Sequence, residues 1–487
     1  MSDNLIRLTA TQAVAKLRRG EISPLDLIDA AEARIAAVDG PVNALPTICL
    51  DRARAHARDL MAGKRREAES EPGWLAGLPV VIKDLADVAG VRTTYGSPIF
   101  ANHIPTKSHP LVERIERRGG IVIAKSNTPE FGAGGNTFNE VFGRTRNPWN
   151  TALTCGGSTG GGAVALATGT AWLAHGSDHG GSLRGPATLT SVVGMRPSPG
   201  RVTRGTSNNL WSPLSVQGPM ARTIPDLALF LDTMAGHCPY DPLTFDAPAE
   251  SFTAAIARPP GKLRIAFTTN YGGRVPVDRE TRDICAREVR KFEAAGCIVE
   301  EAFPDIGPAE DVFLALRSQH FVTDRELQLQ THRAQLKPDI IWNTEQGLQG
   351  TPSKIAWADR ERAALFRRFA KFFETYDILV TPGAPTPAWD VMLRARDTID
   401  GAKLTNYIAG SLLTSAITLT SCPAVSLPCG FDRFGRPIGL QIIAPARQEA
   451  RALSAAALFE QLSGLDRLLP IDPRSGTVPA DEQGALP

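Results

Sequence analysis

Short apolar runs separated by longer helical patterns constrain the fold of this chain more than any other feature of its sequence. The runs occupy residues 78–82, 121–124, 263–267, 378–380 and 439–443. Runs of this length are typical of buried strands, and the segments between them are long enough to form helices. Alternation of strands and helices is the pattern of an α/β sheet. The chain is therefore predicted to be an α/β protein.

Size and composition indicate a soluble globular protein. Of the 487 residues, 43% are hydrophobic and 21% are charged, a balance that suits a large buried core. The 53 basic and 51 acidic side chains nearly cancel, so a nucleic-acid partner is not implied. Seven cysteines without a CxxC pair, and the lack of a signal-like or membrane-spanning segment, predict a cytoplasmic protein with reduced thiols. No metal-ligand spacing and no convincing nucleotide motif occurs, so no metal and no cofactor are expected.

The chain is predicted to form one domain over residues 1–472, followed by a polar tail at 473–487. Within the domain, residues 239–375 contain long charged helical patterns without a chemical motif, which suggests a cap or specificity region. Glycine is concentrated between residues 132 and 200, in GAGGNT, CGGSTGGG and SDHGGSLRGP. Because glycine allows the backbone to approach a ligand closely, this stretch predicts a site built from main-chain groups.

Lys83 ends the apolar run in GLPVVIKDL, so its side chain starts from an apolar neighbourhood. Burial lowers the pKa of a lysine, and a neutral lysine can act as a general base. The plainer interpretation is a lysine at a strand end that pairs with Asp84.

Two serines lie in the glycine-rich stretch. Ser158, in CGGSTGGG, precedes the helix-like AVALATG; it can cap that helix, lie in an anion-binding turn, or act as the nucleophile of a GxSxG elbow. Ser182 follows DHGG, and the N–H groups of such a loop can converge on one oxyanion. Taken alone, HGGS is also compatible with an ordinary turn.

With these residues in view, the sequence resembles the amidase signature family. The motifs GLPVVIKD, GGNTFNEVFGRTRNPWN, LTCGGSTGG, GSDHGGSLRGPA, VVGMRPSPGRV and SCPAVSLPCGF follow one another in the family's order. The likeness extends from about residue 8 to residue 461. It implies a single large α/β domain with a central mixed β-sheet flanked by helices. It also implies a hydrolase of amide C–N bonds that acts on a small molecule, with a homodimer as one expected assembly.

The resemblance assigns a catalytic triad. Ser182 would be the nucleophile, Ser158 the bridging serine that follows a cis peptide bond, and Lys83 the base. In this scheme Lys83 takes a proton from Ser158, which takes the proton of Ser182 as that oxygen attacks the carbonyl carbon. Water then releases the acyl group from the enzyme.

The resemblance also places a supporting site around the triad. The backbone N–H groups expected to form the oxyanion hole belong to His179, Gly180, Gly181 and Ser182. The residues expected to hold this loop are Asp178 and Arg184. The residues expected to bind substrate are Gly132, Ala133 and Gly134. The rest of the pocket is expected to be bounded by the stretch after Lys83, such as Tyr95, and by the variable region that includes Trp211, Trp342 and Trp357.

Three positions depart from the residues usual in the family, namely Thr159, Ser177 and His179, and none belongs to the triad. A titrating histidine beside the oxyanion hole can tune the pH optimum. The alternative is that the imidazole of His179 packs against its neighbours or faces solvent.

Other functions stay open at this point. The family includes the glutaminase subunit of tRNA-dependent amidotransferases, although Gly185 and the segment WSPLSVQGP differ from the sequence usual there. An α/β-hydrolase esterase with Ser158 as nucleophile needs a downstream histidine, and the histidines here lie in no recognisable motif. A non-enzymatic protein would use the glycine loops only to hold an anion. For an amidase, the expected substrates are small or aryl amides, with esters and carbamates as related carbonyl compounds.

Overall fold

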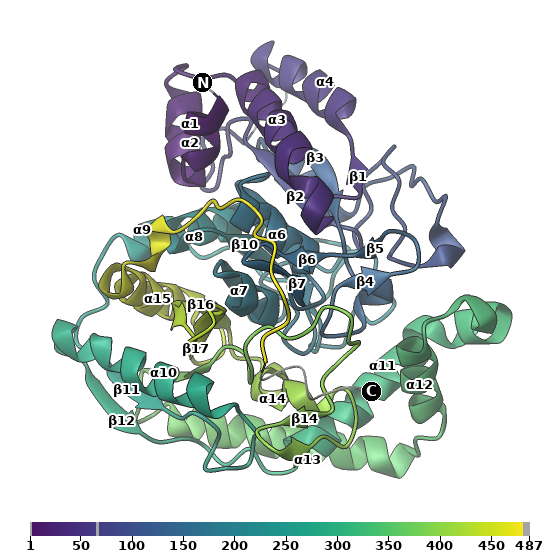
Figure 1. The fold of residues 1–487 in the computed structure, drawn as a ribbon, viewed down its shortest axis with the longest axis vertical. Coiled ribbons are helices and arrows are strands. Elements are labelled where there is room, and N and C mark those ends of the chain that lie inside the picture. The colour runs from purple at the N-terminus through teal and green to yellow at the C-terminus, as the bar shows by residue number, and fades with distance from the viewer. Residues whose placement is uncertain (1, 65–67, 481–487) are drawn as a thin grey trace.

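One large mixed sheet forms the centre of the protein (Figure 1). The computed structural model describes residues 2–64 and 68–480, and within these ranges eleven strands belong to this sheet. In order across the sheet, the strands are β1 (Thr47–Ile48), β3 (Ile121–Ser126), β2 (Pro79–Lys83), β8 (Leu173–Asp178), β10 (Val216–Ala221), β9 (Val193–Arg196), β16 (Ala424–Phe431), β17 (Pro437–Ile443), β13 (Ile378–Pro382), β11 (Arg264–Phe267) and β12 (Ile298–Glu301).

The sheet is parallel toward both sides and antiparallel in the middle. Strands β3, β2 and β8 run parallel to one another, as do β13, β11 and β12. The strands from β8 to β13 pair antiparallel. All five apolar runs predicted from the sequence form strands of this sheet, namely β2, β3, β11, β13 and β17. The prediction of a single large α/β domain with a mixed sheet flanked by helices is confirmed.

Helices cover the sheet. Those that pack on its strands near the centre are α6 (Gly160–Thr168), α7 (Arg184–Thr190), α8 (Ile224–Met234), α10 (Arg279–Val289) and α15 (Glu449–Ser463). The N-terminal helices at the top of Figure 1 are α1 (Ser2–Arg7), α2 (Ala10–Arg18), α3 (Pro24–Val42) and α4 (Leu50–Met61). Among the described residues, no helix combines the length and apolar character needed to cross a bilayer.

The smaller elements lie outside the sheet. Three hairpins consist of β4 (Phe138–Asn139) with β5 (Gly143–Arg144), β6 (Arg146–Asn147) with β7 (Asn150–Thr154), and β14 (Thr398–Ile399) with β15 (Ala402–Lys403). Two further short helices are α5 (Pro110–Arg117) and α9 (Phe252–Ile256).

The region 239–375, predicted as a cap, has two parts with different positions. Its strands β11 and β12 extend the central sheet. Its long helices, α11 (Ala309–His332), α12 (Pro338–Leu348) and α13 (Pro352–Phe372), pack on one another and on α14 (Leu412–Thr420). In Figure 1, α13 lies along the lower edge, and α11 and α12 lie at the right. The part that can contribute to a binding site is therefore the helical one.

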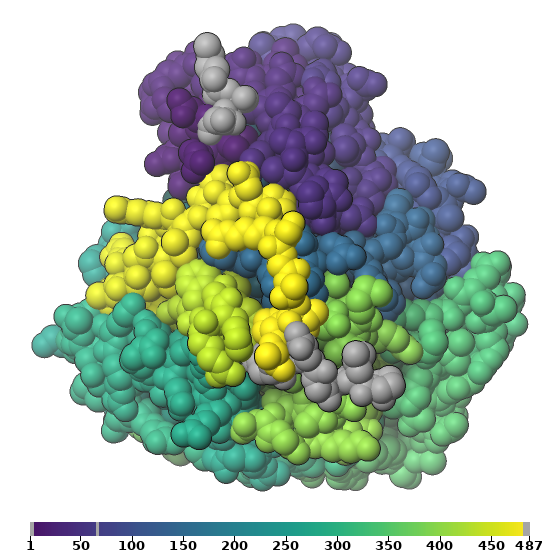
Figure 2. All heavy atoms as spheres, in the orientation of Figure 1, coloured from purple at the N-terminus to yellow at the C-terminus, as the bar shows by residue number. Residues whose placement is uncertain are grey.

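The segment after α15 lies along the surface of the domain, and Figure 2 shows it crossing the face turned to the viewer. The N–H of Ile471 donates to the carbonyl of Ala167 at 2.9 Å, and the N–H of Arg474 donates to that of Pro148 at 2.9 Å. In return, Thr151 donates to the carbonyl of Arg474 at 2.9 Å. The start of the predicted tail is thus held by hydrogen bonds, and its residues 481–487 lie outside the described part of the chain.

Candidate active site

Lys83 is the last residue of β2, and its side chain is fully buried. Its amine Nζ lies 2.7 Å from Oγ of Ser158, 2.9 Å from Oγ1 of Thr159 and 3.0 Å from Oγ of Ser177. The three hydroxyl groups come from different segments, so the amine joins the end of β2 to the start of α6 and the end of β8. The Lys83 amine and the three hydroxyl groups therefore form one cluster.

Among the described residues, no carboxylate forms an ion pair with the Lys83 amine. The expectation that it pairs with Asp84 is wrong, because Asp84 forms its ion pair with Lys125 at 3.0 Å. Burial lowers the pKa of Lys83 to about 7, against the opposing effect of the Asp178 charge. A substantial fraction of the amine is therefore neutral near neutral pH, in the state that can accept a proton.

Ser158 follows a cis peptide bond from Gly157, as the resemblance implied. The backbone around Gly157 is crowded: a Cβ atom at this position would lie 2.6 Å from the carbonyl oxygen of Gly134 and 3.1 Å from the nitrogen of Asn136. Only glycine fits there. This close approach holds the hydroxyl of Ser158 against the lysine amine.

The carboxylate of Asp178 organises the loop that leads to Ser182. It accepts hydrogen bonds from the backbone N–H of Gly181 at 3.0 Å and of Leu183 at 3.1 Å. It also pairs with Arg184 at 2.8 Å and Arg196 at 3.2 Å. Burial by itself raises the pKa of Asp178, but the charges and hydrogen bonds of the two arginines lower it well below its usual range. The carboxylate stays ionised and fixes the loop.

The same contacts reduce the number of N–H groups that are free to form the predicted oxyanion hole. The N–H of Gly181 is already engaged by Asp178, and the carbonyl of Gly180 accepts a hydrogen bond from Oγ1 of Thr414 at 2.6 Å. Within the described part of the chain, the loop residues whose N–H groups form no hydrogen bond are His179, Gly180 and Ser182. These three groups are available for a negatively charged oxygen.

Gly181 is a sensitive point of this loop. Its φ of +121° is disfavoured for other residues, and a Cβ atom would collide with the side chain of Thr414. We expect Gly181→Ala to displace the loop and to lower kcat for an amide by about 10²-fold or more, the cost of losing an oxyanion donor. The measurement is kcat together with the melting temperature. Gly185→Ala is the control for the fold, because a Cβ atom there meets nothing within 4 Å and the melting temperature should not change. An unaltered kcat in Gly181→Ala would contradict this view.

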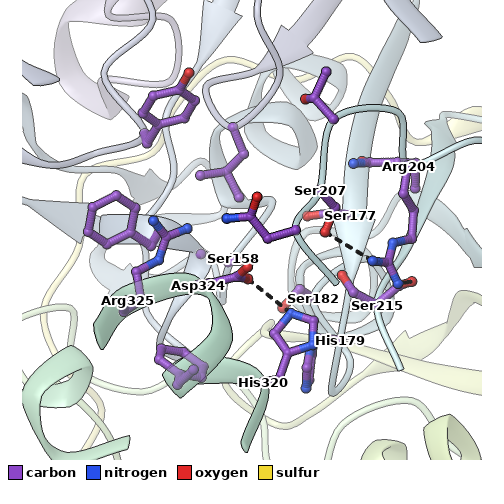
Figure 3. A pocket seen from close by; sticks show the side chains of 18 of the residues that line it. Ser158, Ser177, His179, Ser182, Arg204, Ser207, Ser215, His320, Asp324 and Arg325 are labelled. Carbon is purple, nitrogen blue, oxygen red and sulfur yellow. Dashed lines mark hydrogen bonds and ion pairs between the residues drawn. The ribbon is translucent and has the colours of Figure 1, made fainter. Parts of the chain in front are cut away.

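Ser182 borders two cavities. The first, of about 370 Å³, is also lined by Ser158 and Ser177 and extends to α11. The second, of about 160 Å³, lies against the glycine loops. Figure 3 looks into the first cavity and shows Ser158, Ser182 and His179 close together. A molecule attached at Ser182 can therefore extend in two directions.

A family model covers most of the chain. The model for Amidase matches residues 26–453. The chain belongs to the amidase signature family. It is therefore an amidohydrolase with the family's fold, and the α/β-hydrolase and non-enzymatic alternatives no longer apply.

Two curated members of the amidase signature family are similar over nearly their full lengths. The acylamidase of Rhodococcus erythropolis is 33% identical over 460 residues, covering 94% of this chain and 96% of that protein. A glutamyl-tRNA(Gln) amidotransferase subunit of Moorella thermoacetica is 34% identical over 493 residues, covering 96% and 99%. Among solved structures, a bacterial aryl acylamidase of the family superposes with a TM-score of 0.86 at 26% identity, covering 95% of this chain and 97% of that one.

Of the three residues predicted to bind substrate in this amidase, two line a cavity beside Ser182 and one does not. Gly132 lines both cavities and Gly134 lines the second. Ala133 lines neither, because its side chain is buried in an apolar cluster with Phe321 and Ile340.

The predicted boundary of the pocket is formed by Tyr95 and by the variable region, but not by its tryptophans. Tyr95 lines the first cavity. The three tryptophans line neither of the two, whereas other residues of the variable region line the first cavity. Trp211 is 78% exposed, Trp342 packs against Tyr407, and Trp357 lies beneath the amine of Lys354.

Sequence reasoning missed the polar face of α11. Five of its side chains line the first cavity at positions i, i+3, i+4, i+7 and i+8, namely Arg317, His320, Phe321, Asp324 and Arg325. This spacing is that of one helix face. The signal was present in the sequence, but a charged helix face is ordinarily turned to solvent.

His179 packs into the wall of the first cavity. Its ring contacts Phe313 and His320 edge-on, with centroids 5.6 Å and 4.8 Å apart. Burial, followed by the charges of His320 and Arg317, holds the pKa of His179 well below its usual value. The imidazole is neutral at neutral pH, so the structure favours the packing role over control of the pH optimum.

Proposed function

We propose that the protein is a serine amidase that cleaves C–N bonds through an acyl-enzyme on Ser182, with Ser158 and Lys83 as its proton relay. The observation that carries this proposal is the buried amine of Lys83, which lies 2.7 Å from Ser158 and has a pKa of about 7. Ser158 and Ser182 line the same cavity. A base, a bridging hydroxyl and a nucleophile are therefore present in one place.

The hydrogen-bond capacity of the neutral amine fits this relay. A neutral lysine has two N–H donors and one lone pair. Thr159 and Ser177 each offer an acceptor oxygen, at 2.9 Å and 3.0 Å, which leaves the lone pair for the hydroxyl of Ser158. Removal of a proton from Ser158 by Lys83 then lets Ser158 take the proton of Ser182.

The bond changes follow from that transfer. Oγ of Ser182 bonds to the carbonyl carbon, and the oxygen that becomes negative is stabilised by the free N–H groups of the loop. The proton returns through Ser158 to the amine as the C–N bond breaks. Water then attacks the ester of Ser182, passes its proton along the same relay, and releases the acid. Asp178 and Arg184 hold the loop and transfer no proton.

Small or aryl amides are the proposed substrates. The acylamidase of Rhodococcus erythropolis is 33% identical to this chain, and the aryl acylamidase superposes with a TM-score of 0.86. The machinery recognises a carbonyl group, so esters and carbamates are proposed as additional substrates. The proposal includes a cytoplasmic location. It also includes a homodimer, and size-exclusion chromatography with light scattering tests this assembly.

A glutaminase subunit is the second candidate, because the amidotransferase protein of Moorella thermoacetica is 34% identical to this chain. The two functions differ in a simple assay. An amidase hydrolyses an anilide without a second protein, whereas a glutaminase subunit would release ammonia from glutamine. Ammonia release that requires an added partner, without anilide hydrolysis, would favour the second candidate.

The pKa of Lys83 predicts the pH profile. The base must be neutral, so protonation at low pH removes activity and deprotonation restores it. We expect kcat/KM for an uncharged anilide to rise with pH through a half-maximal point at about 7 and to level off above it. Burial lowers the pKa values of His179 and His320, which moves their titration away from this point. A half-maximal point near 10 would show that the lysine is an ordinary ammonium.

Covalent labelling tests the nucleophile directly. A fluorophosphonate should modify Ser182, and peptide mass spectrometry identifies the modified residue. Ser158→Ala should still be labelled on Ser182, but at a lower rate than the wild type. Labelling of Ser158 that persists in Ser182→Ala would overturn the proposed mechanism.

A further inference from the structure

Three arginines line the first cavity, and none forms a salt bridge within the described residues. They are Arg204, from the loop after β9, and Arg317 and Arg325, from α11. Arg204 and Arg317 are buried, and Arg325 is partly buried. Buried charges in proteins are ordinarily paired. Guanidinium groups without a carboxylate partner therefore need an explanation at this position.

Two of the three are held by neutral groups. Arg204 donates to Oγ of Ser207 at 3.0 Å and to carbonyl oxygens of its own loop. Nε of Arg317 donates to Oδ1 of Asn343 at 3.0 Å, and Nη2 donates to the hydroxyl of Tyr407 at 3.3 Å. These contacts orient the guanidinium groups without neutralising them.

Arg325 is different, because within the described residues no hydrogen bond or ion pair engages its guanidinium. The group lies over the ring of Phe131, 3.9 Å from its centroid, which fixes its plane and leaves its N–H donors unused. Figure 3 shows Arg325 and Arg204 on opposite sides of the cavity. A planar fork of free donors is suited to a carboxylate or a similar anion.

The remaining charges of the cavity do not compensate the arginines. Asp324 is the single carboxylate among the lining residues, and it contacts His320 at 3.2 Å. Three guanidinium groups therefore face one carboxylate in the lining, and burial lowers the pKa values of His179 and His320. Burial lowers the pKa of Arg204 despite the opposing charges of Asp241 and Asp324. It also lowers the pKa of Arg325 despite the opposing charges of Asp324 and Glu130. The cavity therefore favours a negatively charged group.

The second cavity, which shares Gly132, Ser182 and Arg317 with the first, has a different character. Its wall is made mainly of glycines and apolar side chains, which include Leu189, Phe313, Trp389, Ile399, Leu404 and Ile408. Arg317 and Arg396 also contribute to it. The two cavities that meet at the nucleophile thus suit different halves of one molecule.

We propose that the natural substrate is an amide with an anionic group on one side of the scissile carbonyl, bound by Arg325, and an apolar group on the other side. This inference rests on the proposed amidase function and names its substrate class. The anion is a carboxylate or a group of like charge and shape, attached either to the acyl part or to the amine part. Arg325 is a specificity residue here and takes no part in proton transfer.

A paired substrate panel tests the proposal with the intact protein. One arm uses anilides whose acyl chain ends in a carboxylate, with the number of methylene groups varied. The other arm uses amino acids carrying an apolar N-acyl group. Each compound is compared with its carboxamide, which has nearly the same shape and no charge. The readout is the ratio of kcat/KM for the carboxylate to that for the carboxamide. We expect a ratio of about tenfold or more in at least one arm, the size of one charge-assisted hydrogen bond.

Variants assign that ratio to one side chain. Arg325→Gln should reduce it to about one, whereas Arg325→Lys, which keeps the charge, should retain part of it. Arg360→Gln is the matched control, because it removes an exposed arginine from α13 and should leave the ratio unchanged. If Arg325→Gln does not fold, the wild-type ratio and its decrease with added salt still decide the question.

The outcomes separate the two proposals. Hydrolysis of carboxylates and carboxamides at similar rates in both arms would overturn the anionic substrate and leave the amidase function standing. A preference that survives in Arg325→Gln would overturn the role of Arg325. Absence of hydrolysis of any amide by the wild type would overturn the proposed function itself.

Discussion

Ser182→Ala is expected to lower kcat for an anilide by about 10⁶-fold, the scale observed when a serine hydrolase loses its nucleophile. Alanine has no oxygen to form the acyl-enzyme, while the oxyanion donors and both cavities remain. The loss should therefore appear in kcat, with little change in substrate affinity. Single-turnover kinetics and a binding measurement with an unreactive analogue separate the two quantities.

Ser158→Ala is the informative companion variant. Its expected loss is smaller, about 10²- to 10⁴-fold, because the relay is interrupted but the nucleophile is intact. If Ser158 were the nucleophile, Ser158→Ala would show the larger loss of kcat and Ser182→Ala the smaller one. Residual activity of Ser182→Ala above that of Ser158→Ala would contradict the proposed roles.

Lys83→Met is expected to lower kcat/KM for an amide by about 10²- to 10⁴-fold and to remove the rise in activity through pH 7. Methionine fills a similar volume and has no basic nitrogen. The rate should fall more for amides than for esters of the same acyl group. An amine must be protonated as it leaves, whereas the alkoxide of an alcohol with a low pKa can leave without protonation. Steady-state rates on a matched amide and ester measure the difference.

Lys125→Met is the matched control for this variant. Lys125 lies on the neighbouring strand β3 and is equally buried, but its ammonium pairs with Asp84 at 3.0 Å. Removing it takes the ion-pair partner from the buried carboxylate of Asp84, which keeps only its hydrogen bonds from Thr94. Breaking a buried ion pair in this way costs about 3 to 5 kcal/mol of stability. We expect a lower melting temperature with kcat retained in the folded protein. Equal losses of kcat in the two variants would show that burial of a lysine, rather than its position beside Ser158, is what matters.

The sequence was sufficient for the strands that consist of apolar residues. Strands β2 and β3 are continuous buried runs, and this pattern is recognisable without a structure. Strand β8 was not recognised because it continues through Gly176 and Ser177 to Asp178. The polar residues at the end of β8 belong to the candidate site, so the composition of this segment does not indicate a buried strand.

Some residues of the candidate site could likewise be predicted from the sequence, and others could not. Lys83, Ser158 and Ser182 lie in short motifs with a fixed order, and these motifs were enough to single them out. Arg325 could not be found in this way, because a charge on a helix is ordinarily solvated and only the packing of α11 turns it inward. The use of the Gly181 N–H by Asp178 also depends on a loop conformation that no residue pattern specifies.

The position of Ser182 between two cavities has a consequence for the second half of the reaction. Once the first product departs, the acyl group still occupies one cavity and the other is vacant. The nucleophile that ends the cycle must arrive through the vacated side, where the wall that had recognised the leaving group now meets the incoming molecule. An amine that resembles the leaving group would compete there with water. In the proposed mechanism, such competition would produce amide exchange as well as hydrolysis, with the ratio set by the concentration of the amine.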